Sequence, residues 1–217
     1  MRTIANLFFI SLVVNFISCS NDDLIIGSGS PTSEFRTVSN FSKVSTEGVF
    51  DVTINQDTVQ TVEIIADDNI IHNVKTKVVD NELRLYLDDN NYRSIALEAH
   101  ITVPSINGLK NLGVGDISIL DIDITDDFHV YNSGTGTISM EGVAQNLILE
   151  NEGSGKFEGF QFSVLSCNVY IVGRGDCEVN ASNQLHADIK GSGNVYYKGT
   201  PVLDVNISGS GNAINTN

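Results

Sequence analysis

The chain has 217 residues, with 12 Lys and Arg against 27 Asp and Glu and a formal charge of −15 at pH 7. Its length suits one domain with a real core, and 41% apolar residues argue against a chain disordered by composition. The acidic balance argues against nucleic acid and against docking on anionic lipid headgroups, because both need clustered Lys and Arg. Three Cys residues are too few for a disulfide-dense scaffold.

Residues 1–18 have the features of an export signal. A positively charged start precedes a mostly apolar stretch over residues 4–17, which is long enough for a secretory signal and too short to span a membrane. The following Phe-Ile-Ser-Cys at residues 16–19 is similar to a bacterial lipobox, although Leu is the usual first residue. This interpretation predicts a lipoprotein signal peptide over 1–18 and lipidation at Cys19. The alternative is an ordinary signal peptide followed by a chance Cys.

Polar and glycine-rich segments follow. The acidic stretch at residues 20–23 resembles the export tag of some Bacteroidetes-type lipoproteins, and residues 27–33 have the composition of a flexible linker. We therefore expect a flexible tether over 19–34, a single folded domain over 35–217, and an exported outer-membrane lipoprotein. Whether the domain faces the periplasm or the cell exterior stays open.

The first half of the domain has the period-two alternation of half-buried strands. One helical candidate of a turn or two lies at Asn69–Lys77, with Asp67 or Asp68 as its cap. The predicted strands, which turn signals separate, lie at 49–54, 62–64, 83–87 and 101–103.

The second half, residues 113–217, is an internal repeat. Six Gly-x-Gly units recur with first-glycine intervals of 21, 19, 20, 18 and 18 residues. We interpret all twelve glycines as corner residues with positive φ. They are Gly113 and Gly115, Gly134 and Gly136, Gly153 and Gly155, Gly173 and Gly175, Gly191 and Gly193, and Gly209 and Gly211.

Apolar residues stand in columns relative to these glycines. They recur four residues after each first glycine, and four and six residues before the last five first glycines. A unit of about 19 residues is too short for a strand and a crossover helix, so stacked coils must bury the columns against one another. The pattern predicts an all-β fold, a right-handed parallel β-helix (a single-stranded β-solenoid) with a β-rich N-terminal portion. The alternative is an antiparallel sandwich with hairpin turns at Gly-x-Gly.

Several motifs together resemble a known family. They are Phe-Arg-x-Val at 35–38 followed by Phe41, the strand at 48–54, Asn-Glu-Leu-Arg-Leu at 81–85, Ile-x-Val-Pro at 101–104, and the Gly-Ser-Gly-Asn endings. The chain is similar to the head GIN domain described for auto-transporter adhesins, common in Bacteroidetes lipoproteins. The resemblance covers about residues 35–216 and implies a secreted or surface β-helix. It provides no catalytic residues.

Several candidate sites have a structural interpretation that we prefer. Arg174-Gly175-Asp176 is an integrin-type triplet, but it falls within the repeat's own corner. Cys167 and Cys177 occupy apolar columns and are expected to be core thiols, although an exported protein could oxidise them to a disulfide.

Metal sites are not expected. His129 and His186 share an outward column about 14 Å apart, too far to bind one metal ion. His72 and His100 have no partner that spacing reveals. The acidic residues between Asp116 and Asp127 form a solvated loop in our interpretation, with a Ca²⁺ site as the alternative.

These features favour a non-catalytic, lipid-anchored adhesion or binding module without cofactor, metal or catalytic residues, touching the membrane only through its lipid. Candidate partners are a polysaccharide or a host or cell-surface protein, with no nucleic acid, and the ligand and oligomeric state stay open. The first alternative is a polysaccharide lyase or hydrolase, which needs a carboxylate pair or a carboxylate-bound Ca²⁺ with a basic catalytic residue. The second is an envelope structural protein without a ligand. Ser, Thr, Asn and Tyr ladders are expected on the outward sheet faces.

Overall fold

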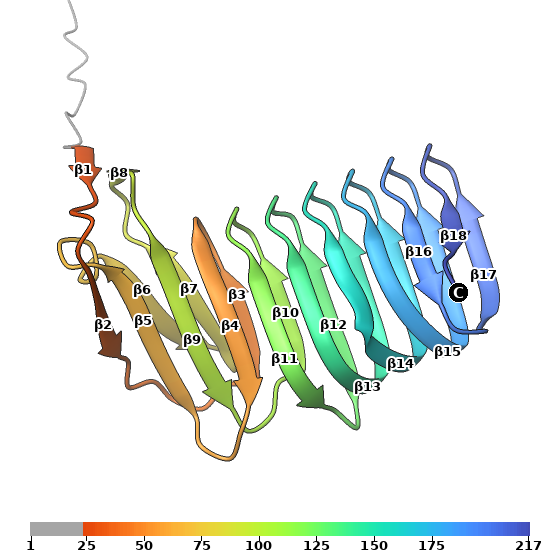
Figure 1. The fold of residues 1–217 in the computed structure, drawn as a ribbon, viewed down its shortest axis with the longest axis horizontal. Coiled ribbons are helices and arrows are strands. Elements are labelled where there is room, and N and C mark those ends of the chain that lie inside the picture. The colour runs from red at the N-terminus through yellow and green to blue at the C-terminus, as the bar shows by residue number, and fades with distance from the viewer. Residues whose placement is uncertain (1–23) are drawn as a thin grey trace, which may run out of the picture.

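The computed structural model describes residues 24–217, and the predicted signal peptide and Cys19 lie outside this range. The all-β class is confirmed, since the described residues form eighteen strands and no helix. No helix in this part of the chain could therefore cross a membrane. Figure 1 shows the strands side by side along the long axis, with β1 and β2 at one end and β17 and β18 at the other.

The strands divide evenly between the two halves of the chain. The first nine are β1 (Leu24–Ile26), β2 (Pro31–Phe35), β3 (Lys43–Thr46), β4 (Phe50–Gln56), β5 (Thr61–Asp67), β6 (Val74–Val79), β7 (Glu82–Leu87), β8 (Asn91–Arg93) and β9 (Leu97–Val103). The others are β10 (Gly108–Asn111), β11 (Ile117–Asp123), β12 (Asp127–Asn132), β13 (Ile138–Asn151), β14 (Phe157–Ile171), β15 (Cys177–Ile189), β16 (Val195–Lys198), β17 (Val202–Ile207) and β18 (Ala213–Asn215).

The N-terminal strands mix antiparallel and parallel pairing. β5 is antiparallel to both β2 and β9, and β6 is antiparallel to β7 across a turn where Asp80 and Asn81 have φ of 51° and 64°. Positive φ at both central residues suits a two-residue hairpin of type I′. Two strands of the first half pair in parallel with strands of the second half: β4 pairs with β11, and β3 pairs with β10.

Among β10 to β18 all pairing is parallel and joins residues one repeat apart. Ile138 pairs with Ile117 on one side and with Phe157 on the other, while Leu149 pairs with Val130 and Val169. The first part of β13 pairs with β11 and its last part with β12, so the sheet curls around the apolar side chains. We call β10 to β18 the repeat stack.

The predicted apolar columns form the core of the repeat stack. Leu185 and Ala187 in β15, which belong to these columns, and Ile189, which the prediction did not include, are 0% exposed. In the last repeat the equivalent Leu203, Val205 and Ile207 are 45%, 37% and 44% exposed, because β17 has a strand neighbour on one side only. The columns therefore match the prediction, and burial in them is lost where the stack ends.

The twelve Gly-x-Gly glycines lie between strands, but they do not have the positive φ that we expected. Positive φ occurs instead at Gly29, Gly48, Gly142 and Gly199. A Cβ on any of the twelve would lie 1.9–2.2 Å from a backbone carbonyl oxygen, such as Gly136 Cβ to Gly115 O. Close approach of the backbone of successive repeats therefore explains these glycines.

Two local predictions were wrong. Residues 68–73 form turns and β6 begins at Val74, so the short helix at Asn69–Lys77 is absent from the described structure. The apolar residues Ile70 and Ile71, which suggested one face of a helix, are buried side chains of this turn. The second is the flexible tether over 19–34. Within its described part, residues 24–26 form β1, and residues 31–34 belong to β2.

Candidate functional site

A hollow on the outer face of β3, β10, β12 and β13 is the candidate binding site. It has a volume of about 330 Å³, and its lining includes Gly108 and the two strand neighbours of Gly108 in register, Lys43 and His129. Gly108 has no side chain, and the stem of Lys43 lies beside it, since a Cβ on Gly108 would be 3.1 Å from Lys43 Cγ. The hollow is lined by Lys43, Val44, Glu82, Gly108, Leu109, Lys110, His129, Val130, Tyr131, Ile148 and Glu150.

Ion pairs fix one wall of the hollow. Glu82, whose side chain is 8% exposed, accepts from Lys110 Nζ at 2.6 Å and from Arg84 Nε at 3.0 Å. The carboxylate of Glu82 thus pairs with Arg84 on its own strand, β7, and with Lys110 on β10. Charge-assisted hydrogen bonds of this kind are among the stronger ones in proteins.

Tyr131, the strand neighbour of Lys110 in register, also lines the hollow. Its hydroxyl donates to Glu152 Oε2 at 2.8 Å, and this hydrogen bond together with burial raises the pKa of Tyr131 above its usual value. The phenol therefore stays neutral at physiological pH, and its half-buried ring is held beside the hollow. An aromatic ring with a fixed polar tip is a common feature of binding surfaces.

The two predicted outward histidines are as far apart as expected. Strand register places Ile148 and Asn168 between His129 and His186, so three strand spacings separate them. His129 lines the hollow, whereas His186 Nδ1 lies 2.9 Å from Asp204 Oδ2 and beside the ring of Tyr170. Only His129 therefore belongs to the candidate site.

The acidic residues between Asp116 and Asp127 are not gathered around one point. Asp116 Oδ1 accepts from Thr137 N at 2.7 Å, and Asp127 Oδ1 accepts from Asn146 Nδ2 at 2.7 Å. Within residues 24–217 no three His, Cys, Asp or Glu side chains are arranged to hold a metal ion. The carboxylates of Asp116 and Asp127 instead cross-link neighbouring repeats.

Asp176 of the Arg-Gly-Asp triplet has a similar structural role. Its Oδ1 accepts from Asn194 N at 2.7 Å and from Asn194 Nδ2 at 3.1 Å, one repeat further on. Arg174 is exposed on the corner, whereas the Asp176 carboxylate is hydrogen-bonded to the next repeat. The geometry supports the structural interpretation of this triplet.

Cys167 and Cys177 are both free thiols in the core, 1% and 0% exposed. Burial raises the pKa of Cys167 far above its usual value and that of Cys177 to about 12, so both stay protonated. This arrangement matches the preferred interpretation of two core thiols.

A buried asparagine ladder was missed by sequence reasoning. Asn111, Asn132 and Asn151 are 0% exposed and stand two residues before the first glycine of their repeats. Asn132 Nδ2 donates to Asn151 Oδ1 at 3.1 Å, and Asn151 Nδ2 donates to Gly155 O at 3.0 Å. The ladder thus provides hydrogen bonds to the corners from within, whereas stacked Asn residues had been expected on outward faces.

Polar contacts attach the N-terminal segment to one end of the domain. β1 lies parallel to β8, while Gly29 N donates to Asp67 Oδ1 at 2.9 Å and Asn69 Nδ2 donates to Ile26 O at 2.8 Å. These contacts hold residues 24–29 against β8 and the turn after β5.

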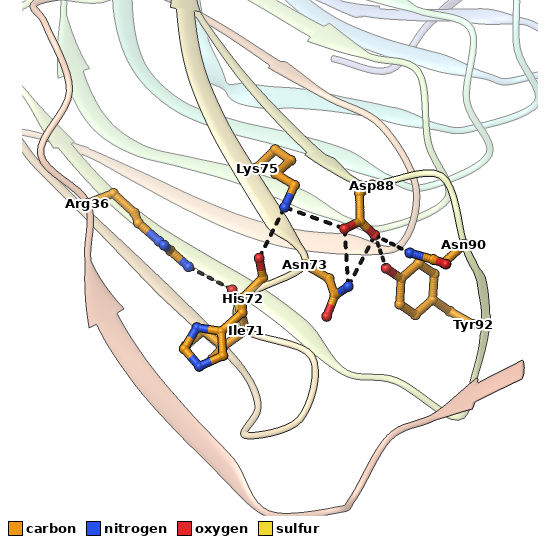
Figure 2. A network of polar contacts seen from close by, with 8 residues as sticks. All are labelled: Arg36, Ile71, His72, Asn73, Lys75, Asp88, Asn90 and Tyr92. Carbon is orange, nitrogen blue, oxygen red and sulfur yellow. Dashed lines mark hydrogen bonds and ion pairs between the residues drawn. The ribbon is translucent and has the colours of Figure 1, made fainter. Parts of the chain in front are cut away.

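Asp88 is the centre of the network beneath this attachment, shown in Figure 2. Its carboxylate accepts from Tyr92 Oη, from Asn90 Nδ2 at 2.9 Å and from Asn73 Nδ2 at 3.1 Å, and it lies 3.4 Å from Lys75 Nζ. The hydrogen bonds from Tyr92 and Asn90 lower the pKa of Asp88 to about 2. The network joins β6 and the preceding turn to β8, on which β1 rests.

Comparison with known proteins identifies the family. The family model described as "Putative auto-transporter adhesin, head GIN domain" matches residues 40–201. The chain belongs to the head GIN domain family. This confirms the resemblance found from the sequence motifs. No protein with a curated description matches the chain.

Solved structures agree with this assignment. A "putative adhesin" from Bacteroides fragilis is 26% identical with a TM-score of 0.75, covering 88% of this chain and 100% of its own. A "putative lipid binding protein" from Parabacteroides distasonis and a "putative adhesin" from Parabacteroides merdae are both 18% identical, with TM-scores of 0.55 and 0.54. Each of these two covers 90% of this chain and 100% of its own, and at this identity they support the fold alone.

Proposed function

We propose that this head GIN protein is a lipid-anchored, surface-exposed protein of the outer membrane that acts as a non-catalytic adhesion module. In this proposal the repeat stack is a right-handed single-stranded β-helix, and the hollow around Gly108 binds the partner. The parallel pairing of residues one repeat apart supports the β-helix, and membership of an adhesin family supports the function.

The observation that carries the proposal is the position of the N-terminal attachment relative to the hollow. β1 is attached at one end of the long axis, and only residues 20–23 separate Leu24 from the predicted lipid on Cys19. A domain anchored by that end would stand away from the membrane. The hollow, on a side of the domain formed by β3, β10, β12 and β13, would then be accessible to a partner.

Protease treatment of intact cells tests the location. We expect an added protease to remove the domain from wild-type cells, and a Cys19→Ala variant to appear in the medium or the periplasm instead. Complete protection of the wild-type domain in intact cells, with digestion after lysis, would overturn surface exposure.

A second experiment tests the absence of catalysis. The full chain, purified in non-ionic detergent, would be incubated with a panel of host and bacterial polysaccharides, followed by assays for new reducing ends and unsaturated ends. We expect neither product. Cleavage that co-purifies with the wild-type chain would overturn the non-catalytic function and favour the polysaccharide-active alternative.

A further inference from the structure

Four cationic side chains lie together on the outer face beside the hollow, although the chain as a whole is strongly acidic. We call Lys43, Lys77, Arg84 and Lys110 the basic strip. Lys77 pairs with Arg84 in register, Arg84 with Ser45, and Ser45 with Lys110, so three strand spacings, about 14 Å, separate Lys77 from Lys110. All four basic residues are exposed.

The strip has an excess of positive charge. Glu82 lies within it and forms ion pairs with Arg84 and Lys110. Among the described residues, Lys43 and Lys77 have no carboxylate within ion-pair distance. The overall charge of −15 acts on this surface only weakly at physiological salt, because exposed charges are screened over about 8 Å. The local cations therefore decide which ligand charge the strip favours.

The strip continues directly into the hollow. Lys110 pairs in register with Tyr131, Lys43 pairs with Gly108, and all four residues line the hollow. A linear polymer that crosses the strands would meet Lys77, Arg84 and Lys110 in turn and then the ring of Tyr131. His129, on the same strand as Tyr131, and Glu150, the next residue in register after Tyr131, offer polar groups that can bind hydroxyls.

We propose that the basic strip and the hollow together bind an anionic polysaccharide, one that bears carboxylate or sulfate groups. This inference rests on the proposed adhesion function and names the ligand class of the same site. The cations bind the acidic groups, and the hollow with Tyr131, His129 and Glu150 receives a sugar ring. An acidic peptide has the charge but not the ring hydroxyls that the hollow accommodates.

Binding of defined probes to the full chain in non-ionic detergent tests this proposal. The probes are polygalacturonate, dextran sulfate, neutral dextran and polyglutamate. We expect retention on polygalacturonate or dextran sulfate, weaker retention on polyglutamate and none on neutral dextran. Equal affinity for polyglutamate, or binding of neutral dextran at the same level, would overturn the proposal.

Charge-neutralising variants locate the site. Lys43→Gln with Lys77→Gln removes two cations that make no ion pair in the described structure, and should weaken binding at least about tenfold if each contacts an acidic group. Lys190→Gln with Lys198→Gln removes the same charge elsewhere and should leave binding within about twofold. Equal effects of the two double variants would overturn the proposal, provided that both melt like the wild type.

Different results would show that the ligand class is wrong and that the adhesion function is wrong. If none of the four probes binds while cells that carry the protein still adhere, the ligand class is wrong and the adhesion function stands. If the chain cleaves polygalacturonate, the non-catalytic function fails even though the anionic ligand is correct.

Discussion

A Cβ placed on Gly136 would lie 1.9 Å from the carbonyl oxygen of Gly115, one repeat earlier in the stack. A similar contact recurs at every Gly-x-Gly position, so the backbone of each corner rests directly on the one before it, and the first corner rests on residues 48–50. No side chain fits between them without moving one backbone.

Gly136→Ala should therefore destabilise the protein by about 1–3 kcal/mol or more, because the obstacle is backbone and not a side chain that can rotate away. Thr135→Ala, at the exposed residue between the two glycines, is the matched control and should change stability by no more than about 0.5 kcal/mol. Urea unfolding measures both. Similar small losses in the two variants would mean that the repeats do not approach as closely as described.

Leu185 and Leu203 occupy the same column in successive repeats and differ in exposure, 0% against 45%. Leu185→Ala should cost about 2–5 kcal/mol, since it leaves a cavity in the core. Leu203→Ala should cost under about 1 kcal/mol, because much of its side chain is already in contact with water. Equal losses, measured by the midpoint of urea unfolding, would show that the last repeat is covered in solution.

The Asp88 network predicts a pH dependence. Because the folded-state pKa of about 2 is below the ordinary value of 3.8, ionised Asp88 stabilises the fold above about pH 4, and this stabilisation is lost as the pH falls toward 2. It amounts to at most about 2 kcal/mol, since the side chain is 30% exposed and solvent screens it. The stability difference between wild type and Asp88→Asn should shrink between pH 4 and pH 2.5. A difference that stays constant over this range would contradict the network.

The buried thiols predict slow chemical modification. In a Cys19→Ser chain at pH 8, a thiol reagent should not label Cys167 or Cys177 in the folded state, because burial keeps both protonated and inaccessible. Unfolding in guanidinium chloride without reductant should expose two thiols per chain. Fewer than two would indicate a disulfide, and rapid labelling of the folded chain would contradict the burial.

The repeat and its columns could be predicted from the sequence because each column is periodic. The role of the glycines was partly misjudged, since spacing does not distinguish a need for positive φ from close backbone contact. The asparagine ladder was missed because Asn is usually exposed, although the column signal was present. Asn111, Asn132 and Asn151 occupy the position that Ile171 and Ile189 fill in later repeats.

The basic strip and β1 depend on contacts between distant segments, and no local pattern reveals such contacts. Lys77 and Lys110 lie three strand spacings apart because β6 pairs with β7, and β3 pairs with both β7 and β10. The three residues of β1 have too little alternation to predict a strand, and their partner β8 lies more than 60 residues further on. The sequence thus predicted the repeat stack better than the surface on which we place the binding site.

Adherence of living cells to an immobilised anionic polysaccharide tests the central claim most directly. Cells would carry the wild-type protein, the Lys43→Gln and Lys77→Gln variant, or the Lys190→Gln and Lys198→Gln control, at equal surface amounts. The account predicts that the first variant adheres no better than cells without the protein, while the control adheres like the wild type. Equal adherence of all three, above that of cells without the protein, would contradict it.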